Sequence, residues 1–389
     1  MIPPSALAAG SRFEDYEIER LISSDGSFGL VYLAFDHSAP RVEARRRQLE
    51  HRLGGWRRAD GPLGYAAKVR AGPSPGPRVV IKEFFPAELA ERDSGRRTVS
   101  PRAGQGDLYQ WSRTRFLDEA RFLQGHEHPN VVAVFDVLSA NNTEYMVMEQ
   151  LDGGSLEALV QGRGRQTEAE VRRWLRPVLR ALQSTEARDV DHLDLSPQNV
   201  MFRRPGGDPV LIDFGAARMS TASRTRGSRL IVNDGYSAPE KYQSTSQGLD
   251  ARADVYALGA LVVFALTGRR PPGPAEGAAS AFGAAPAGAA SAPFLKVIAL
   301  CLEPEPGRRA ADARGLERAL EPWDPAAPVS TQGRQNVGPA PGPALSDPNL
   351  RRRVQVAFLA LLGLLFVLLL IGPALALAGP ADLLGGDLG

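Results

Sequence analysis

Short apolar runs separated by turn residues characterise the first part of the chain. Residues 14–36 alternate such runs with a glycine turn, and RVVIKEFF at 78–85 repeats the pattern, which predicts β-strands. Two later runs, VVAVFDVL and EYMVMEQL, predict two more strands. The intervening stretch SRTRFLDEARFLQGH places Phe116, Ala120 and Leu123 at helical intervals. Together these positions predict a lobe built mainly from sheet.

Helical periodicity dominates the second part of the chain. It marks five segments: SLEALVQG, EAEVRRWLRPVLRALQSTEA, DVYALGALVVFALTG, FLKVIALCL and ADARGLERAL. The predicted fold is therefore α+β and bilobal, with a small β-rich N-lobe (14–149) and a larger α-helical C-lobe (150–323). Three stretches of biased composition interrupt it: a basic insertion at 37–77, an Ala/Gly/Pro-rich loop at 271–293 and a Pro-rich segment at 324–353, predicted to be a flexible linker.

An uncharged apolar run lies near the C-terminus. VAFLALLGLLFVLLLIGPALALA, from Val356 to Ala378, is long enough to cross a bilayer as a helix, so we predict a transmembrane helix at 354–378 and a short tail at 379–389. Three arginines, 351–353, precede the run, and the tail has no basic residue. The positive-inside tendency then predicts a single-pass protein of the cell (inner) membrane, with its main body in the cytoplasm. The alternative is a helix buried in a soluble domain. A helix of more than twenty residues in such a domain exposes one face to water and is polar there, whereas this run is apolar throughout.

Composition and charge exclude several functional classes of protein. A formal net charge of +2 gives no sign of nucleic-acid binding. The single cysteine, Cys301, excludes an internal disulfide framework and a cysteine-based zinc site, and its leucine neighbours predict a core residue. The five histidines lack metal-ligand spacing, and the first residues lack the pattern of a signal peptide.

Candidate chemistry begins in the glycine turn SSDGSFGLVYLA at 23–34. Gly26 and Gly29 fit a GxGxxG spacing, in which backbone N–H groups can approach phosphate oxygens. Ser24 occupies the first glycine position. An ordinary hairpin is therefore an alternative interpretation.

A lysine on a predicted strand follows. Lys82 in VVIKEFFP can hold the α- and β-phosphates of a nucleotide if a helix carboxylate positions it, and Glu119 is the candidate partner. Lys68 in YAAKV also lies in an apolar run. The sequence downstream of Lys82 favours it, with an exposed strand lysine as the alternative.

Two later stretches carry the remaining candidate chemistry. DHLDLSPQNVMF at 191–202 contains Asp194 and, five residues later, Asn199, while LIDFGAAR places Asp213 directly after an apolar run. Phosphoryl transfer uses an Asp that orients the attacking hydroxyl, and an Asn and an Asp that hold Mg²⁺. GYSAPEKY and DVYALG follow in order.

In this order the motifs resemble a eukaryotic-type serine/threonine protein kinase of the bacterial, membrane-anchored kind, over roughly residues 14–323. KEFFPAELAERD, with the later TVSP, also resembles a subgroup that has KE, an aromatic residue and FP after the strand lysine. The resemblance implies ATP and Mg²⁺, with Mn²⁺ as an alternative metal. It also implies cytoplasmic protein substrates that bear Ser or Thr, and it allows self-association for autophosphorylation.

The resemblance implies roles for the matching residues. The implied catalytic residues are Asp194, Lys82, Asn199 and Asp213. Asp194 is the catalytic base, Lys82 forms the nucleotide-positioning ion pair with Glu119, and Asn199 and Asp213 are the metal ligands. The implied nucleotide-binding residues are Ser24, Gly26, Gly29, Val31, Lys82, Glu119, Glu149 and Leu151, with Glu149 to Leu151 as the adenine hinge. The implied structural features are the His128–Asn130 turn after the Glu119 helix, Met148 as gatekeeper, the Glu240–Arg309 ion pair, and Asp254 as the brace of the catalytic loop.

The catalytic stretch departs from the family pattern at two positions. Leu193 replaces the arginine that usually precedes the catalytic Asp and pairs with a phosphorylated activation loop. Ser196 replaces a lysine that in many kinases touches the transferred phosphoryl group. The neighbouring His192 is interpreted as a structural hydrogen-bonding residue rather than an acid or base.

The head of the insertion, RVEARRRQLEHRLGGWRR, spaces apolar residues at roughly helical intervals among arginines: Val42, Leu49, Leu53 and Trp56. This pattern is typical of a helix lying on an anionic bilayer, and equally of a solvated insertion.

Three functions compete. The leading one is ATP-dependent serine/threonine kinase activity on cytoplasmic proteins, tethered to the membrane. A membrane-anchored pseudokinase scaffold is favoured by Ser24, Leu193 and Ser196. A small-molecule phosphotransferase shares the Asp-to-Asn spacing, but the APE segment and DVYALG are typical of a platform for protein substrates.

Overall fold

The computed structural model describes residues 5–26, 29–38, 41, 43–45, 47, 77–93, 97–214, 233–242, 249–273 and 289–321. The chain divides into two compact units, Met1–Ala327 and Pro328–Gly389, and every described residue belongs to the first. Lys68, the predicted linker, the predicted transmembrane helix and the tail all lie outside the described residues. Among the described residues, no helix combines the length and the apolarity needed to cross a membrane.

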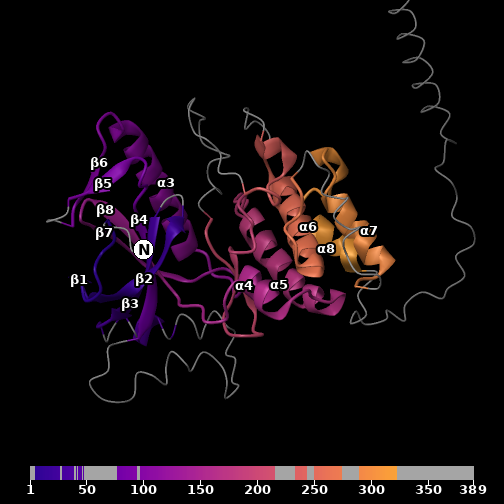
Figure 1. The fold of residues 1–389 in the computed structure, drawn as a ribbon, viewed down its shortest axis with the longest axis horizontal. Coiled ribbons are helices and arrows are strands. Elements are labelled where there is room, and N and C mark those ends of the chain that lie inside the picture. The colour runs from indigo at the N-terminus through magenta and orange to yellow at the C-terminus, as the bar shows by residue number, and fades with distance from the viewer. Residues whose placement is uncertain are drawn as a thin grey trace, which may run out of the picture. The chain divides into compact units, whose positions relative to one another are not determined.

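A six-stranded antiparallel sheet forms the N-lobe (Figure 1). Its strands are β1 (Arg12–Phe13), β2 (Tyr16–Gly26), β3 (Gly29–Asp36), β4 (Arg78–Phe84), β7 (Val134–Ala140) and β8 (Thr143–Met148). They lie in the order β1-β2-β3-β4-β8-β7, so β4 is flanked by β3 and β8. The predicted strands are confirmed, and the register places Lys82 of β4 between Val31 and Met146.

Helix α3 (Gly106–Gln124) packs against β7 and β8. Phe116, Ala120 and Leu123 are buried at the predicted spacing, and Glu119 is buried beside them. The helix begins six residues before the apolar pattern that predicted it, because Tyr109 extends the buried face among polar neighbours. The buried face of the helix, which packs against β7 and β8, therefore includes one carboxylate.

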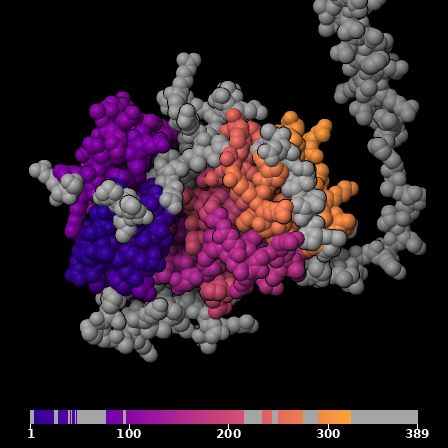
Figure 2. Space-filling view, in the orientation of Figure 1, coloured from indigo at the N-terminus to yellow at the C-terminus, as the bar shows by residue number. Residues whose placement is uncertain are grey.

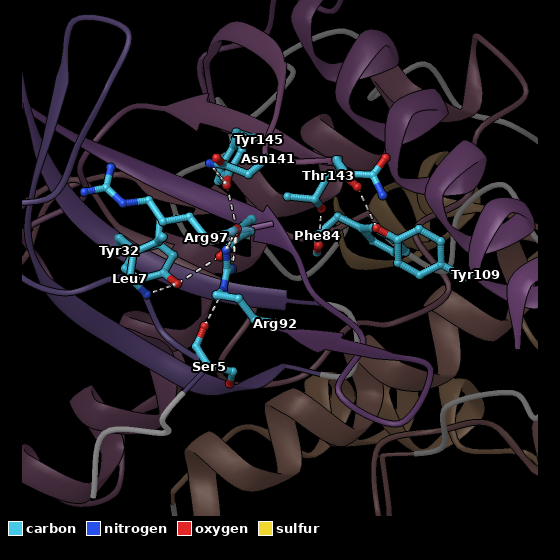
Figure 3. A network of polar contacts seen from close by, with 12 residues as sticks. Ser5, Leu7, Tyr32, Phe84, Arg92, Arg97, Tyr109, Asn141, Thr143 and Tyr145 are labelled. Carbon is cyan, nitrogen blue, oxygen red and sulfur yellow. Dashed lines mark hydrogen bonds and ion pairs between the residues drawn. The ribbon is translucent and has the colours of Figure 1, made fainter. Parts of the chain in front are cut away.

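A buried polar network ties the N-lobe together (Figure 3). The carboxylate of Glu83, which is fully buried, accepts hydrogen bonds from Arg92 at 2.6 Å, Tyr145 at 2.7 Å and Tyr32 at 2.9 Å. Arg92 comes from a hairpin of two short strands that the apolar pattern did not predict, β5 (Ala90–Arg92) and β6 (Val99–Pro101). Arg92 also donates to Ser5 O at 2.6 Å, so the network fixes the start of the described chain on the lobe.

Replacing Arg92 by methionine is expected to lower the free energy of unfolding by about 3–5 kcal/mol, because it leaves the Glu83 carboxylate buried without its cation. Urea unfolding followed by tryptophan fluorescence measures the change. The control is Arg12→Met, which removes an ion pair to Glu17 whose arginine side chain is 69% exposed, and which should change stability little. Equal losses in the two variants would contradict the assignment of Arg92 as a buried counter-ion.

Five α-helices of the C-lobe lie within the described residues, and all five were predicted: α4 (Leu156–Arg163), α5 (Glu168–Glu186), α6 (Ala251–Thr267), α7 (Ala292–Cys301) and α8 (Ala313–Leu320). Every residue from Ala253 to Thr267 is buried, so α6 is the central helix of the lobe. Cys301 is buried beside it, and burial raises the pKa of its thiol to about 12, which confirms the prediction of a core residue. Figure 2 shows the N-lobe residues (indigo to purple) gathered on one side and the C-lobe residues (magenta to orange) on the other.

A short hairpin joins the two lobes. Strands β9 (Val200–Phe202) and β10 (Pro209–Leu211) pair with one another, and Leu211 N donates to Asn130 O at 2.8 Å. Asn130 also donates its side-chain amide to Pro209 O at 2.7 Å. The predicted turn after the Glu119 helix is thus confirmed, and it fixes the strand that leads into Asp213.

The first residues of the basic insertion fold back onto the N-lobe. The guanidinium of Arg45 is buried, pairs with Asp36 and donates to the Tyr16 hydroxyl. This arginine is therefore a packing residue. The four apolar positions of the predicted surface helix, 42, 49, 53 and 56, lie outside the described residues.

Candidate active site

The predicted ion pair of the N-lobe is present and has a third member. Lys82 Nζ lies 3.5 Å from Glu119 Oε1 and 2.8 Å from Asp213 Oδ1. Burial opposes the charge on Lys82, but the two carboxylates outweigh it and raise the pKa of the ammonium. Burial raises the pKa of Glu119 to about 7, against the opposing effect of Lys82. One amine from the N-lobe therefore reaches a carboxylate of the C-lobe.

The glycine turn forms the β2–β3 hairpin. Gly26 lies opposite Gly29, and residues 27 and 28 at its tip are outside the described residues. A Cβ on Gly29 would lie 2.1 Å from Glu83 O of β4, so packing alone requires glycine there. Ser24 lies on β2 just before the turn, and Val31 lies on β3 beside Lys82. The hairpin is compatible with both interpretations of the motif.

The predicted catalytic stretch is an irregular segment between α5 and β9. Asn199 donates its amide to Asp194 O at 2.8 Å, which closes the loop between the two residues. Leu193 and Asp213 have φ of 59° and 61°, a left-handed conformation that is uncommon for residues other than glycine, and more so for leucine than for aspartate. The Asp194 side chain is 17% exposed, and burial raises the pKa of its carboxyl. The loop thus presents a largely buried carboxylate in a strained setting.

Asp254 braces this loop, as predicted. Its carboxylate accepts the backbone N–H groups of His192 at 2.7 Å and Leu193 at 2.8 Å. His192 is fully buried and its Nε2 lies 3.1 Å from Ile212 O. Burial lowers the pKa of this imidazole to about 4, so the ring is neutral near pH 7 and the structural interpretation is confirmed.

Asp254 should make stability depend on pH. Burial raises the pKa of its carboxyl to about 8, although two N–H groups oppose the shift. The folded state then holds a proton that the unfolded state has released, so stability is lost as pH rises toward 8. Between pH 6.5 and 8, above the range in which His192 titrates, the free energy of unfolding should fall by about 1–2 kcal/mol more in the wild type than in Asp254→Asn.

Urea unfolding at the two pH values checks this. Asp250→Asn is the matched control, because Asp250 caps the same helix, α6, through its contact with Arg252 N and asparagine is also a good cap. It should keep the wild-type dependence on pH. A slope that is unchanged in Asp254→Asn would show that this carboxyl titrates outside the window.

The segment after β8 contains the predicted hinge. Met148 ends β8, and Glu149 is buried behind it, where its N–H donates to Ala133 O and its carboxylate accepts from Ala133 N and pairs with Arg203. The Glu149 side chain is therefore a structural group, and what it can offer a ligand is its backbone carbonyl. Leu151 lies partly buried against the core.

Two residues that the sequence did not single out touch Asp194. Asn233 Nδ2 donates to Asp194 Oδ1 at 2.8 Å, and Lys241 Nζ lies 3.6 Å from the same oxygen. Both flank the APE segment, and Lys241 lies in the short helix η2 (Pro239–Tyr242). One sequence feature could have indicated these two residues. They lie on either side of GYSAPE, and the catalytic stretch has a serine, Ser196, where a lysine is usual.

The APE segment is anchored as predicted. Arg309 donates to both oxygens of Glu240, at 2.7 and 2.9 Å, and its guanidinium is fully buried. It also donates to Arg252 O at 3.1 Å, which ties the segment to α6. Lys241 directly follows Glu240, so the ion pair with Arg309 also fixes the backbone position of Lys241.

The residues predicted to hold a metal supply oxygen ligands of the kind Mg²⁺ prefers. The Asn199 amide nitrogen is committed to Asp194 O, which leaves its oxygen as the donor atom, and the Asp213 side chain is 40% exposed. Two protein oxygens fit Mg²⁺, which usually keeps several waters and takes phosphate oxygens. In the part of the chain that the structure describes, no group of three or more His, Cys, Asp or Glu residues could hold an ion by protein ligands alone.

The fold and this site define a phosphotransferase architecture, and comparisons with known proteins identify the family. The model of the protein kinase domain matches residues 98–312, more than half of the chain. Serine/threonine-protein kinase Pkn1 of Myxococcus xanthus is 40% identical over 162 residues, which are 40% of this chain and 23% of the relative. Serine/threonine-protein kinase PknJ of Mycobacterium tuberculosis is 31% identical over 279 residues, 71% of this chain and 38% of the relative.

A solved structure agrees with this. The structure titled "PpkA-294 apo form" has a TM-score of 0.60 and 26% identity, and the match covers 82% of this chain and all of that one. The chain belongs to the protein kinase family, and its bacterial relatives are of the serine/threonine type. The predicted enzyme class, an ATP-dependent serine/threonine kinase, agrees with this family. The chain spans less than two fifths of the length of these two curated relatives.

Proposed function

We propose that the chain is an active kinase that transfers the γ-phosphoryl group of ATP to serine or threonine of cytoplasmic proteins. The observation that carries the proposal is the contact of Lys82 Nζ with Asp213 Oδ1 at 2.8 Å, because it brings the two lobes together around the position of a nucleotide. Lys82 would hold the α- and β-phosphates, and Glu119 would keep it in place. Asn199 and Asp213 would hold Mg²⁺, which neutralises charge on the phosphates.

Asp194 is the proposed catalytic base. Asn233 and Lys241 both approach its Oδ1, so Oδ2 is the oxygen that we assign to the substrate hydroxyl. Burial raises the pKa of this carboxyl above its usual range, while Lys241 and Asn233 lower it. A carboxylate whose pKa is raised in this way is a better proton acceptor than an exposed aspartate.

The nucleotide would lie beneath the β2–β3 hairpin. We assign its phosphates to the turn that contains Ser24, Gly26 and Gly29, and one face of its base to Val31. The adenine edge is assigned to the backbone of Glu149 and Leu151, since the Glu149 carboxylate is committed to Ala133 and Arg203.

The pseudokinase scaffold remains the second candidate, because Leu193 and Ser196 remove two cations. Incubating the full chain in detergent with γ-labelled ATP, Mg²⁺ and a basic acceptor protein separates the two. Label transfer that is lost in Asp194→Asn supports the kinase. The scaffold is favoured if nucleotide binds and the wild type transfers no label.

The membrane tether and the subgroup are finer parts of the proposal. The apolar run 356–378 supports a single-pass helix with the kinase domain on the cytoplasmic side. Flotation of the chain with lipid vesicles, lost when the run is deleted, tests it. The full burial of Glu83, the glutamate of the KE pair, gives the subgroup motif a structural reason.

A further inference from the structure

The position that usually supplies a cation to the transferred phosphoryl group is occupied by a small neutral residue. Ser196 is buried, and its carbonyl accepts the N–H of Asn199 at 3.0 Å, so it belongs to the turn that shapes the loop. A phosphoryl group in transfer carries negative charge on its equatorial oxygens. Loss of one cation at that place is expected to slow transfer unless another replaces it.

Lys241 places an ammonium beside the same aspartate from a different part of the chain. Its side chain is 4% exposed, its Nζ donates to Leu193 O at 2.7 Å, and it lies 3.6 Å from Asp194 Oδ1. A buried ammonium is costly unless it has partners, and these partners are one carbonyl and one largely buried carboxylate. Nζ has three N–H donors, so the group can bind a further oxygen next to Asp194.

The backbone around Lys241 makes this position rigid. Lys241 N donates to Ala238 O at 2.9 Å, and the preceding Glu240 is held by Arg309. Upstream, Tyr236 N and Ser237 N both donate to Asn233 O, at 3.0 and 2.9 Å. The segment 233–242 therefore carries two groups, Asn233 and Lys241, onto one carboxylate oxygen.

We propose that Lys241 is a catalytic residue that replaces the missing cation and contacts the transferred phosphoryl group; this rests on the kinase activity proposed above. In the step, the substrate oxygen forms a bond to the γ-phosphorus, the bond to the β,γ-bridging oxygen breaks, and ADP leaves with that electron pair. The hydroxyl proton passes to Asp194. Lys241 keeps its protons and stabilises the equatorial oxygens throughout.

A purely structural role is the alternative, since Lys241 also holds the carbonyl of Leu193. Moving the cation separates the two roles. Lys241→Met should lower kcat by roughly 10²-fold and change the KM for ATP by less than about threefold. The double variant Ser196→Lys with Lys241→Met returns an ammonium to the loop but does not restore the bond to Leu193 O. It should recover at least about tenfold of the lost kcat.

Further variants keep the test decisive if Lys241→Met does not fold. Ser196→Lys alone should raise kcat by less than about threefold, because the site already holds its cation. Lys296→Met is the control for loss of a lysine, since Lys296 is exposed on α7. Thermal unfolding of each full-length variant reports whether it is folded.

Each outcome bears on one claim. The proposal for Lys241 is overturned if the folded Lys241→Met variant keeps kcat within about threefold of the wild type, or if the double variant recovers nothing. It is also overturned if Ser196→Lys alone accelerates transfer by more than about tenfold. Absence of transfer by the wild type would instead reject the kinase activity itself.

Discussion

Asparagine at position 194 is expected to lower kcat by about 10³-fold while ATP and Mg²⁺ still bind. The amide has nearly the size of the carboxylate, and its oxygen can still accept the hydrogen bond from Asn233 at Oδ1. It cannot take the proton of a substrate hydroxyl. The nucleotide contacts assigned to Lys82 and Asp213 are untouched, so the KM for ATP should change little.

Transfer of labelled phosphate measures kcat, and calorimetric titration with ATP and Mg²⁺ measures binding. Asp191→Asn is the matched control, because Asp191 lies in the same loop and is partly buried, and its electrostatic neighbours are Asp250, Asp189 and Asp254 rather than Asp194. It should retain kcat within about threefold. If Asp194→Asn transferred phosphate at the rate of Asp191→Asn, the assignment of the base would be wrong.

Most of the fold could be predicted because its signal is local. The five α-helices that the structure describes in the C-lobe follow from apolar spacing, and α6, which is apolar on all sides, is the buried helix. The β5–β6 hairpin was missed because its strands have three residues each, and two of the three in β5 are charged. What stabilises it is distant in sequence: Arg92 pairs with Glu83, and no window of apolar residues contains that pairing.

The residues of the candidate site also differ in whether their signal is local in the sequence. Lys82, Asp194, Asn199 and Asp213 lie in motifs whose order identifies them, and the structure adds the distances between them. Lys241 could not be predicted in this way, because it meets Asp194 only after the chain has folded back from residue 194 to residue 241. Spacing within the loop shows that a cation is missing at Ser196, but it does not indicate which distant lysine replaces it.

Methionine at position 82 should lower kcat/KM for ATP by at least about 10³-fold, a loss of about 4 kcal/mol in transition-state stabilisation. It removes the amine that faces both Glu119 and Asp213, and so leaves two carboxylates where phosphates must bind. Burial already raises the pKa of Glu119 to about 7, with Lys82 opposing. Without Lys82 the Glu119 carboxyl should therefore take up a proton, and the folded variant should lose stability as pH rises through the pKa of that carboxyl.

Glu119→Gln is the informative companion. It leaves Lys82 in contact with Asp213 at 2.8 Å, so we expect a loss of only about 10- to 30-fold in kcat/KM. If Glu119 acts by positioning Lys82, the double variant should be no worse than Lys82→Met alone, because the group that it positions is already gone. Steady-state kinetics of the four proteins measures this coupling. If the losses in kcat/KM of the two single variants multiply in the double variant, Glu119 and Lys82 contribute independently. The ion pair would then belong to the nucleotide-free structure and would not position the lysine on the nucleotide.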